Sequence, residues 1–124
     1  MSLLRSIGAV IVGYLLFAMP AYAFFRITGQ APHQDAPLSV MLASTAVGVV
    51  TACLGSYAAA ALAGRRPLAH GVAVALFIAA GATASLLSTV GHGAIWTQLA
   101  ALLLMAPSAA IGGALRARQR TAAL

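Results

Sequence analysis

Few side chains in this sequence are of a type that takes part in chemistry. The chain of 124 residues has three histidines, one acidic residue, Asp35, and one cysteine, Cys53. Metal sites are built from histidine, cysteine and carboxylate ligands, and only His33, Asp35 and His92 lie in polar segments that could supply such a set. These two segments are far apart in the sequence and have no fixed register. We therefore predict no metal site and no bound cofactor.

The serines and the cysteine do not have the partners that a catalytic nucleophile requires. A serine or cysteine nucleophile needs a neighbouring base to activate it. The serines lie within apolar runs, with no base in helical register beside them. Cys53 lies in the middle of such a run, where cysteine acts as a small hydrophobic residue. We therefore expect that the protein is not an enzyme.

The composition places these residues in a membrane. The chain is 62 % hydrophobic with a mean hydropathy of +0.99, and only 6 % of its residues are charged. Globular domains average roughly 45–50 % apolar and about 25 % charged residues. Four apolar runs, at about 4–25, 38–63, 68–90 and 94–115, are each long enough to cross a bilayer as a helix. The sequence predicts an all-α integral membrane four-helix bundle, with residues 1–124 forming one domain.

Two of these runs have features that need interpretation. The first contains a small-x-small motif at residues 21–23, as a signal peptide does, but its apolar stretch is longer than usual, and we expect it to remain as a helix. Pro20 in that run and Pro107 in the fourth are expected to bend or loosen their helices, because proline removes a backbone hydrogen bond.

Small residues recur at every fourth position of the second run. In a helix this spacing places them on one face, beside a second ridge of small residues. Small residues let membrane helices approach closely, so we expect a neighbouring backbone to lie against this face. The predicted packing residues are Ser44, Gly48, Ala52, Gly55, Ser56, Ala59 and Ala60. A similar ridge, formed by Ala80, Ala84 and Ser88, is predicted on the third helix.

Arginine accounts for every positive side chain apart from histidine, and the net charge is +6. The arginines stand at the ends of the apolar runs, which favours contact with anionic lipid headgroups over nucleic acid. Trp96, near the start of the fourth run, is typical of an anchor at the membrane interface. The side with both termini carries Arg5, Arg65, Arg66, Arg116, Arg118 and Arg120, against Arg26 on the other side. This asymmetry predicts a bacterial-type inner membrane protein with cytoplasmic N- and C-termini.

The near absence of charged residues from the apolar runs limits the functions that the protein can have. Apart from Arg5 at the very start of the first run, no Asp, Glu, Lys or Arg lies inside the four apolar runs, whereas ion-coupled carriers usually keep an ionisable group there. We favour an accessory, scaffold or assembly subunit that acts through helix–helix packing, as a homo-oligomer or with other membrane subunits. The alternative is a small oligomeric transporter or channel with an uncharged pathway. Its lining would come from Ser44, Ser56, Ser85 and Thr89 together with glycine.

Overall fold

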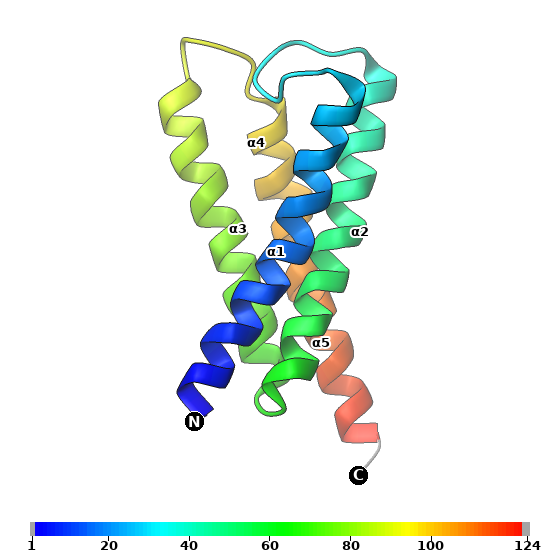
Figure 1. Ribbon diagram of the computed structural model, residues 1–124, viewed down its shortest axis with the longest axis vertical. Helices are drawn as coiled ribbons and strands as arrows, with labels where there is room; N and C mark the ends of the chain where they lie inside the picture. Colours follow the sequence, from blue (N-terminus) through cyan, green and yellow to red (C-terminus); the bar gives the residue numbers. More distant parts are fainter. Residues whose placement is uncertain (1, 123–124) are drawn as a thin grey trace.

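Four long helices form the part of the chain that the computed structural model describes, residues 2–122 (Figure 1). Their most apolar stretches have mean hydropathies between 1.6 and 1.9, and each helix is long enough to cross a membrane. The prediction of an all-α, multi-pass membrane bundle is thereby confirmed. The elements are α1 (Ser2–Thr28), α2 (Leu38–Ala63), α3 (Pro67–Thr89), and a fourth helix in three consecutive segments, α4 (Trp96–Ala100), the π-helix η1 (Ala101–Met105) and α5 (Ala106–Ala122).

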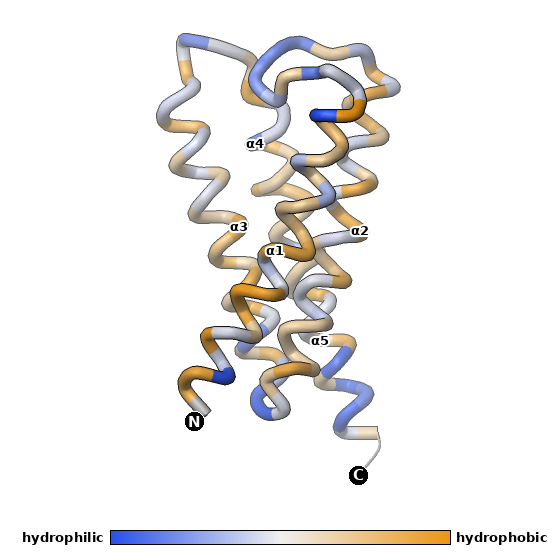
Figure 2. The backbone as a smooth tube through the Cα atoms, in the orientation of Figure 1, coloured by the Kyte–Doolittle hydropathy of each residue, from blue (hydrophilic) through white to orange (hydrophobic). Residues whose placement is uncertain are grey.

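The two ends of the bundle differ in what they contain. The α1–α2 and α3–α4 connections lie together at one end, which we call the loop end (Figure 1). The α2–α3 turn and the outer parts of α1 and α5 lie at the other end, which we call the arginine end. Hydrophilic residues gather at both ends, and apolar residues fill the length between them (Figure 2).

The helices are not packed equally tightly around the bundle. α2 packs extensively against α1 and α5 and also contacts α3, and α3 packs extensively against α5. The contact between α1 and α3 is much more limited. We call this lightly packed boundary the α1–α3 seam.

Glycine and proline set the turn between α2 and α3. Gly64 ends α2 with φ of 73°, in the left-handed region that suits glycine after a helix. Pro67 occupies the first turn of α3, where its missing N–H leaves no bond unmade. Arg66 between them also has a positive φ, 45°, which is uncommon for a residue with a side chain. The turn is therefore very short, and α2 and α3 are antiparallel neighbours.

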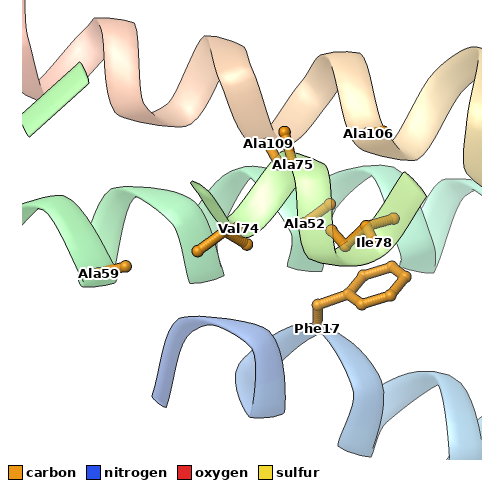
Figure 3. Packing of buried hydrophobic residues seen from close by; sticks show 8 residues of the cluster. All are labelled: Phe17, Ala52, Ala59, Val74, Ala75, Ile78, Ala106 and Ala109. Atoms are coloured by element: carbon orange, nitrogen blue, oxygen red, sulfur yellow. The ribbon is translucent and has the colours of Figure 1, made fainter. Parts of the chain in front are cut away.

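The hydrophobic core consists mainly of small side chains (Figure 3). Phe17 from α1 is its one aromatic member, and Val74 and Ile78 from α3 pack near it. The remaining members are alanines, and the core is thin because the helix backbones approach one another closely. These alanines are Ala52, Ala59, Ala75, Ala106 and Ala109.

The prolines inside the helices have different consequences. α1 continues through Pro20 without a break in its helical assignment. In the fourth helix, the π-helical turn Ala101–Met105 ends two residues before Pro107, and the Ala106 N–H donates to the Ala101 carbonyl five residues back. Since Pro107 has no N–H to offer, the local loosening predicted for this helix takes the form of a π-turn.

Candidate functional site

The small-residue face of α2 lies inside the bundle. All seven of the predicted packing residues on α2 are buried. Gly55 faces Gly13 of α1 so closely that a Cβ on Gly13 would lie 2.6 Å from the Gly55 carbonyl oxygen. On the neighbouring side, the Cys53 carbonyl lies against Gly112, and the Ser56 hydroxyl donates to the Ala109 carbonyl of α5. This face therefore packs within the chain, against α1 and α5.

We expected a neighbouring backbone against the whole small-residue face of α2, but at one position a side chain lies there instead. Gly48 meets the side chain of Met105, and no backbone approaches it among its nearest atoms. Another close approach involves a helix pair that the sequence did not single out. Gly113 of α5 lies against Gly71 of α3, where a Cβ on Gly113 would come 2.6 Å from the Gly71 Cα.

The small-residue ridge on α3, unlike the one on α2, is exposed. In the half of α3 toward the loop end, Ala80, Gly81, Ala84 and Ser88 are all exposed. The nearest atom to a Cβ built on Gly81 would be the Tyr14 hydroxyl, at an ordinary contact distance of 3.5 Å. We call these four residues the α3 ridge. The α3 ridge is a small-residue surface that the bundle does not itself cover.

A groove lies along the loop-end part of α1 at the α1–α3 seam, and Ser85, beside the α3 ridge, is the α3 residue that lines it. It has a volume of about 670 Å³ and is open toward the surroundings of the bundle. Aromatic and small residues of α1 form one wall, and the loop from Gly29 to Pro32 closes the end. The polar side chains on its border are Tyr14, Tyr22, Arg26, Gln30 and Ser85.

A cluster of polar side chains lies at the loop end, and the sequence analysis did not find it. Gln98 is its centre and is only 3 % exposed. Its Nε2 lies 2.8 Å from His33 Nδ1, 3.0 Å from Ser85 Oγ and 3.2 Å from Thr89 Oγ1, so its two protons serve three acceptors. The Thr97 hydroxyl lies 2.9 Å from Gln98 Oε1. We call these five residues the loop-end polar cluster.

The loop-end polar cluster fixes the α1–α2 loop to the end of the bundle. The Thr97 hydroxyl also reaches the Pro32 carbonyl at 2.9 Å, and the Ala94 N–H donates to the His33 carbonyl at 2.9 Å. Trp96 donates its indole N–H to the Gln34 carbonyl at 2.9 Å. A signal for this cluster existed in the sequence, because Gln98 is the only carboxamide in the four apolar runs.

The π-turn brings Gln98 into register with the core. Residues eight apart in a regular α-helix differ in direction by about 80°. The wider π-turn between Gln98 and Ala106 reduces this difference, and both residues are buried, with exposed fractions of 3 % and 7 %. The same helix can therefore present Gln98 to α3 at the loop end and its small residues to α2 and α3 nearer the arginine end.

The three residues considered as metal ligands, His33, Asp35 and His92, do not lie together: the two histidines make hydrogen bonds, and the aspartate is exposed. His33 accepts a hydrogen bond from Gln98 through Nδ1, and the Nδ1–H of His92 donates to the Val90 carbonyl at 3.1 Å. Asp35 is exposed on the loop. Within residues 2–122, no group of three histidine, cysteine, aspartate or glutamate side chains is close enough together to hold a metal ion.

The hydroxyls proposed for a transport pathway lie at separate positions within the chain. Ser44 donates to the Met41 carbonyl within its own helix, and Ser56 bonds across to α5. Ser85 and Thr89 belong to the loop-end polar cluster, where the Thr89 hydroxyl donates to the Ser85 carbonyl at 2.7 Å. These four residues thus occupy three separate places in the bundle.

The arginines have distinct environments. Arg5 donates from Nε to the Leu62 carbonyl at 2.7 Å, so it caps the C-terminal end of α2. Arg116 lies over the Tyr57 ring, 6.0 Å from its centroid. Arg65 and Arg66 are exposed at the α2–α3 turn, and both border a cavity at the arginine end of the α1–α3 seam. Arg118 and Arg120 are exposed in the last turns of α5.

The comparisons with known proteins do not narrow the function. No protein-family model, curated protein sequence or solved structure matches the chain. The geometry and the hydropathy together identify the chain as a four-span, multi-pass helical membrane protein.

Proposed function

We propose that this protein is a non-catalytic accessory or assembly subunit that binds another membrane helix along the α3 ridge. The observation that carries the proposal is the exposure of Ala80, Gly81, Ala84 and Ser88 in a bundle whose other small-residue surfaces are largely buried. In lipid, helices associate where small residues let backbones approach and where packing is better than against lipid chains. The groove beside the ridge offers room for side chains of an incoming helix.

The partner that the proposal favours is a second copy of the same chain. A symmetric pair would place one α3 ridge against the other, and this contact requires no further protein. The surface lies on one helix and pairs with itself, so we expect a dimer. The protein then contributes packing surface to the assembly, while the charged residues of its helices lie near the helix ends rather than in the middle of the spans, where ion-coupled carriers usually keep one.

Subunit counting in lipid bilayers tests this proposal. Ala84→Leu adds three carbon atoms to the ridge, and overpacking of this kind costs roughly 1–3 kcal/mol, equivalent to about 5- to 150-fold weaker association. Ala46→Leu is the matched control, because Ala46 is an exposed alanine on α2, away from the ridge. Monomers in the unsubstituted protein, or equal effects of the two substitutions, would contradict an assembly role for the α3 ridge.

The proposal includes an orientation, with the arginine end in the cytoplasm of a bacterial-type inner membrane. Six arginines at that end against Arg26 at the other support it through the preference for positive residues on the cytoplasmic side. In a Cys53→Ala background, cysteines introduced at Gln34 and Thr121 can be labelled with an impermeant thiol reagent on intact cells. We expect labelling at position 34 only, and labelling at position 121 alone would reverse the orientation.

A further inference from the structure

A second cavity lies between α1 and α3, at the arginine end of the seam. Its volume is about 350 Å³, and its long walls are apolar. Ile7, Val10 and Ile11 line it from α1, and Ala69, Ala73 and Phe77 line it from α3. The α3 residues recur every four positions, so they form one continuous strip along the helix. The strip is about 12 Å long, from a rise of about 1.5 Å per residue.

Positive charge surrounds the mouth of this cavity. Arg65 and Arg66 border it, and both are exposed. The only acidic side chain of the chain, Asp35, lies in the loop at the opposite end of the bundle. Arg5, the other arginine near this turn, is bonded to the C-terminal end of α2. Arg5 keeps its charge in this bond, because a carbonyl is neutral, but Arg65 and Arg66 are the arginines that line the cavity. Neither has an acidic side chain beside it among the described residues, so a counter-charge at this mouth has to come from outside the chain.

The start of α3 adds to this positive field. A helix N-terminus carries partial positive charge and unpaired N–H groups, and it attracts anions. No side chain of the described residues caps α3, and its first turn contains no acidic residue. The left-handed conformation of Arg66 belongs to the turn that places both arginines here. Strained conformations of this kind are retained where the surrounding structure or the function requires them.

We propose that this cavity binds one anionic phospholipid from the leaflet at the arginine end. The phosphate lies against Arg65, Arg66 and the start of α3, and one acyl chain lies along the apolar strip. The strip matches this occupant in length, since one leaflet contributes about half of a hydrocarbon core of about 30 Å. Basic pockets between membrane helices bind lipid headgroups in this manner.

The apolar walls distinguish a lipid from a free anion. Inorganic phosphate would use the arginines and leave the strip unoccupied. The neighbouring cavity between α3 and α5 also has two arginines, Arg66 and Arg120, but its apolar wall on α3 extends only from Pro67 to Val72. The strip beside α1 is about one and a half times as long, from the rise of about 1.5 Å per residue, so we place the acyl chain in the α1–α3 cavity.

Native mass spectrometry of the purified chain, titrated with dioleoyl phosphatidylglycerol, measures the predicted binding. We expect one molecule to be retained per chain, in preference to dioleoyl phosphatidylcholine. Arg65→Gln should weaken retention about fivefold, which is the typical effect of one basic residue near an anionic membrane surface. Arg118→Gln removes the same charge from the same end but lies outside the cavity. It should change retention less than twofold.

A second pair of variants tests the apolar strip. Ala73→Trp fills the cavity and should abolish the selective retention, whereas Leu76→Trp, at an exposed position of the same helix, should preserve it. If Ala73→Trp does not give a monodisperse protein, Ala73→Leu takes its place. Three results would each overturn the proposal: equal losses in Arg65→Gln and Arg118→Gln, full retention after the cavity is filled, or displacement of the lipid by an equal concentration of inorganic phosphate.

Discussion

Gly13→Ala tests how closely α1 and α2 approach each other. The added Cβ would lie 2.6 Å from the Gly55 carbonyl oxygen and 2.7 Å from the Ala59 Cβ. The first distance is about 0.8 Å shorter than the 3.4 Å at which ordinary van der Waals contact begins. Because the obstacle on α2 is backbone, rotation of a side chain cannot relieve the clash. The two helices have to move apart.

The control for this substitution is Gly8→Ala on the same helix. A Cβ on Gly8 would meet no atom of the described residues within 4 Å. Both substitutions replace glycine by alanine within a helix, so the gain in helix propensity cancels when the two are compared. We expect Gly13→Ala to be less stable than Gly8→Ala by about 1–3 kcal/mol, the usual cost of overpacking.

Reversible unfolding in mixed micelles, followed by circular dichroism, measures this difference in the free energy of unfolding. Gly8→Ala should equal or slightly exceed the unsubstituted protein. Equal stabilities of the two alanine variants would refute the close approach of α1 and α2 at Gly13 and Gly55. It would also remove the reason for the alanine-rich core.

Three further substitutions can be measured in the same assay. Gly48→Ala should cost less than Gly13→Ala, under about 1 kcal/mol, because only a flexible methionine side chain lies against it; an equal or larger cost would contradict this. Gln98→Leu should destabilise the protein by about 1–2 kcal/mol, since hydrogen bonds between membrane helices average about 0.6 kcal/mol each, and a neutral effect would mean that the loop is held by other contacts. Arg5→Gln should cost about 0.3–1 kcal/mol, because it removes the charged donor that caps the C-terminal end of α2, whereas Arg118→Gln should be neutral. A larger loss of stability in Arg118→Gln than in Arg5→Gln would refute the capping role of Arg5.

The number of helices and the bounds of α2 could be predicted because lipid imposes strict conditions on a sequence. Apolar runs of spanning length are unmistakable at this composition, and Gly64 and Pro67 mark the turn between α2 and α3. The predicted start and end of α2 agree with the structure, at Leu38 and Ala63. The fourth helix continues to Ala122, beyond the predicted end at residue 115, because arginines extend a helix into the headgroup region.

The partners of the small-residue ridges could not be predicted from spacing. The ridges of the second and third runs have the same four-residue spacing, and only the assembled bundle shows that the ridge of α2 is covered while that of α3 is exposed. The loop-end polar cluster was missed for a related reason. It joins residues 65 positions apart, His33 and Gln98, and depends on a π-turn that rotates Gln98 inward. Neither the distance nor the rotation leaves a periodic signal in the sequence.

The two ends of α3 are held to the rest of the bundle by different kinds of contact, and this difference should affect how the helix moves. At the arginine end, Gly71 and Gly113 hold it backbone to backbone against α5, a contact that cannot slide without a clash. At the loop end, α3 is fastened largely through the hydrogen bonds of Gln98 to Ser85 and Thr89. α3 is thus held rigidly by backbone packing at the arginine end, and at the loop end by hydrogen bonds that can break and re-form. Loss of these hydrogen bonds would free the loop end of α3, with the α3 ridge, to move relative to α4, and amide exchange in α3 should quicken steadily from Gly71 toward Thr89.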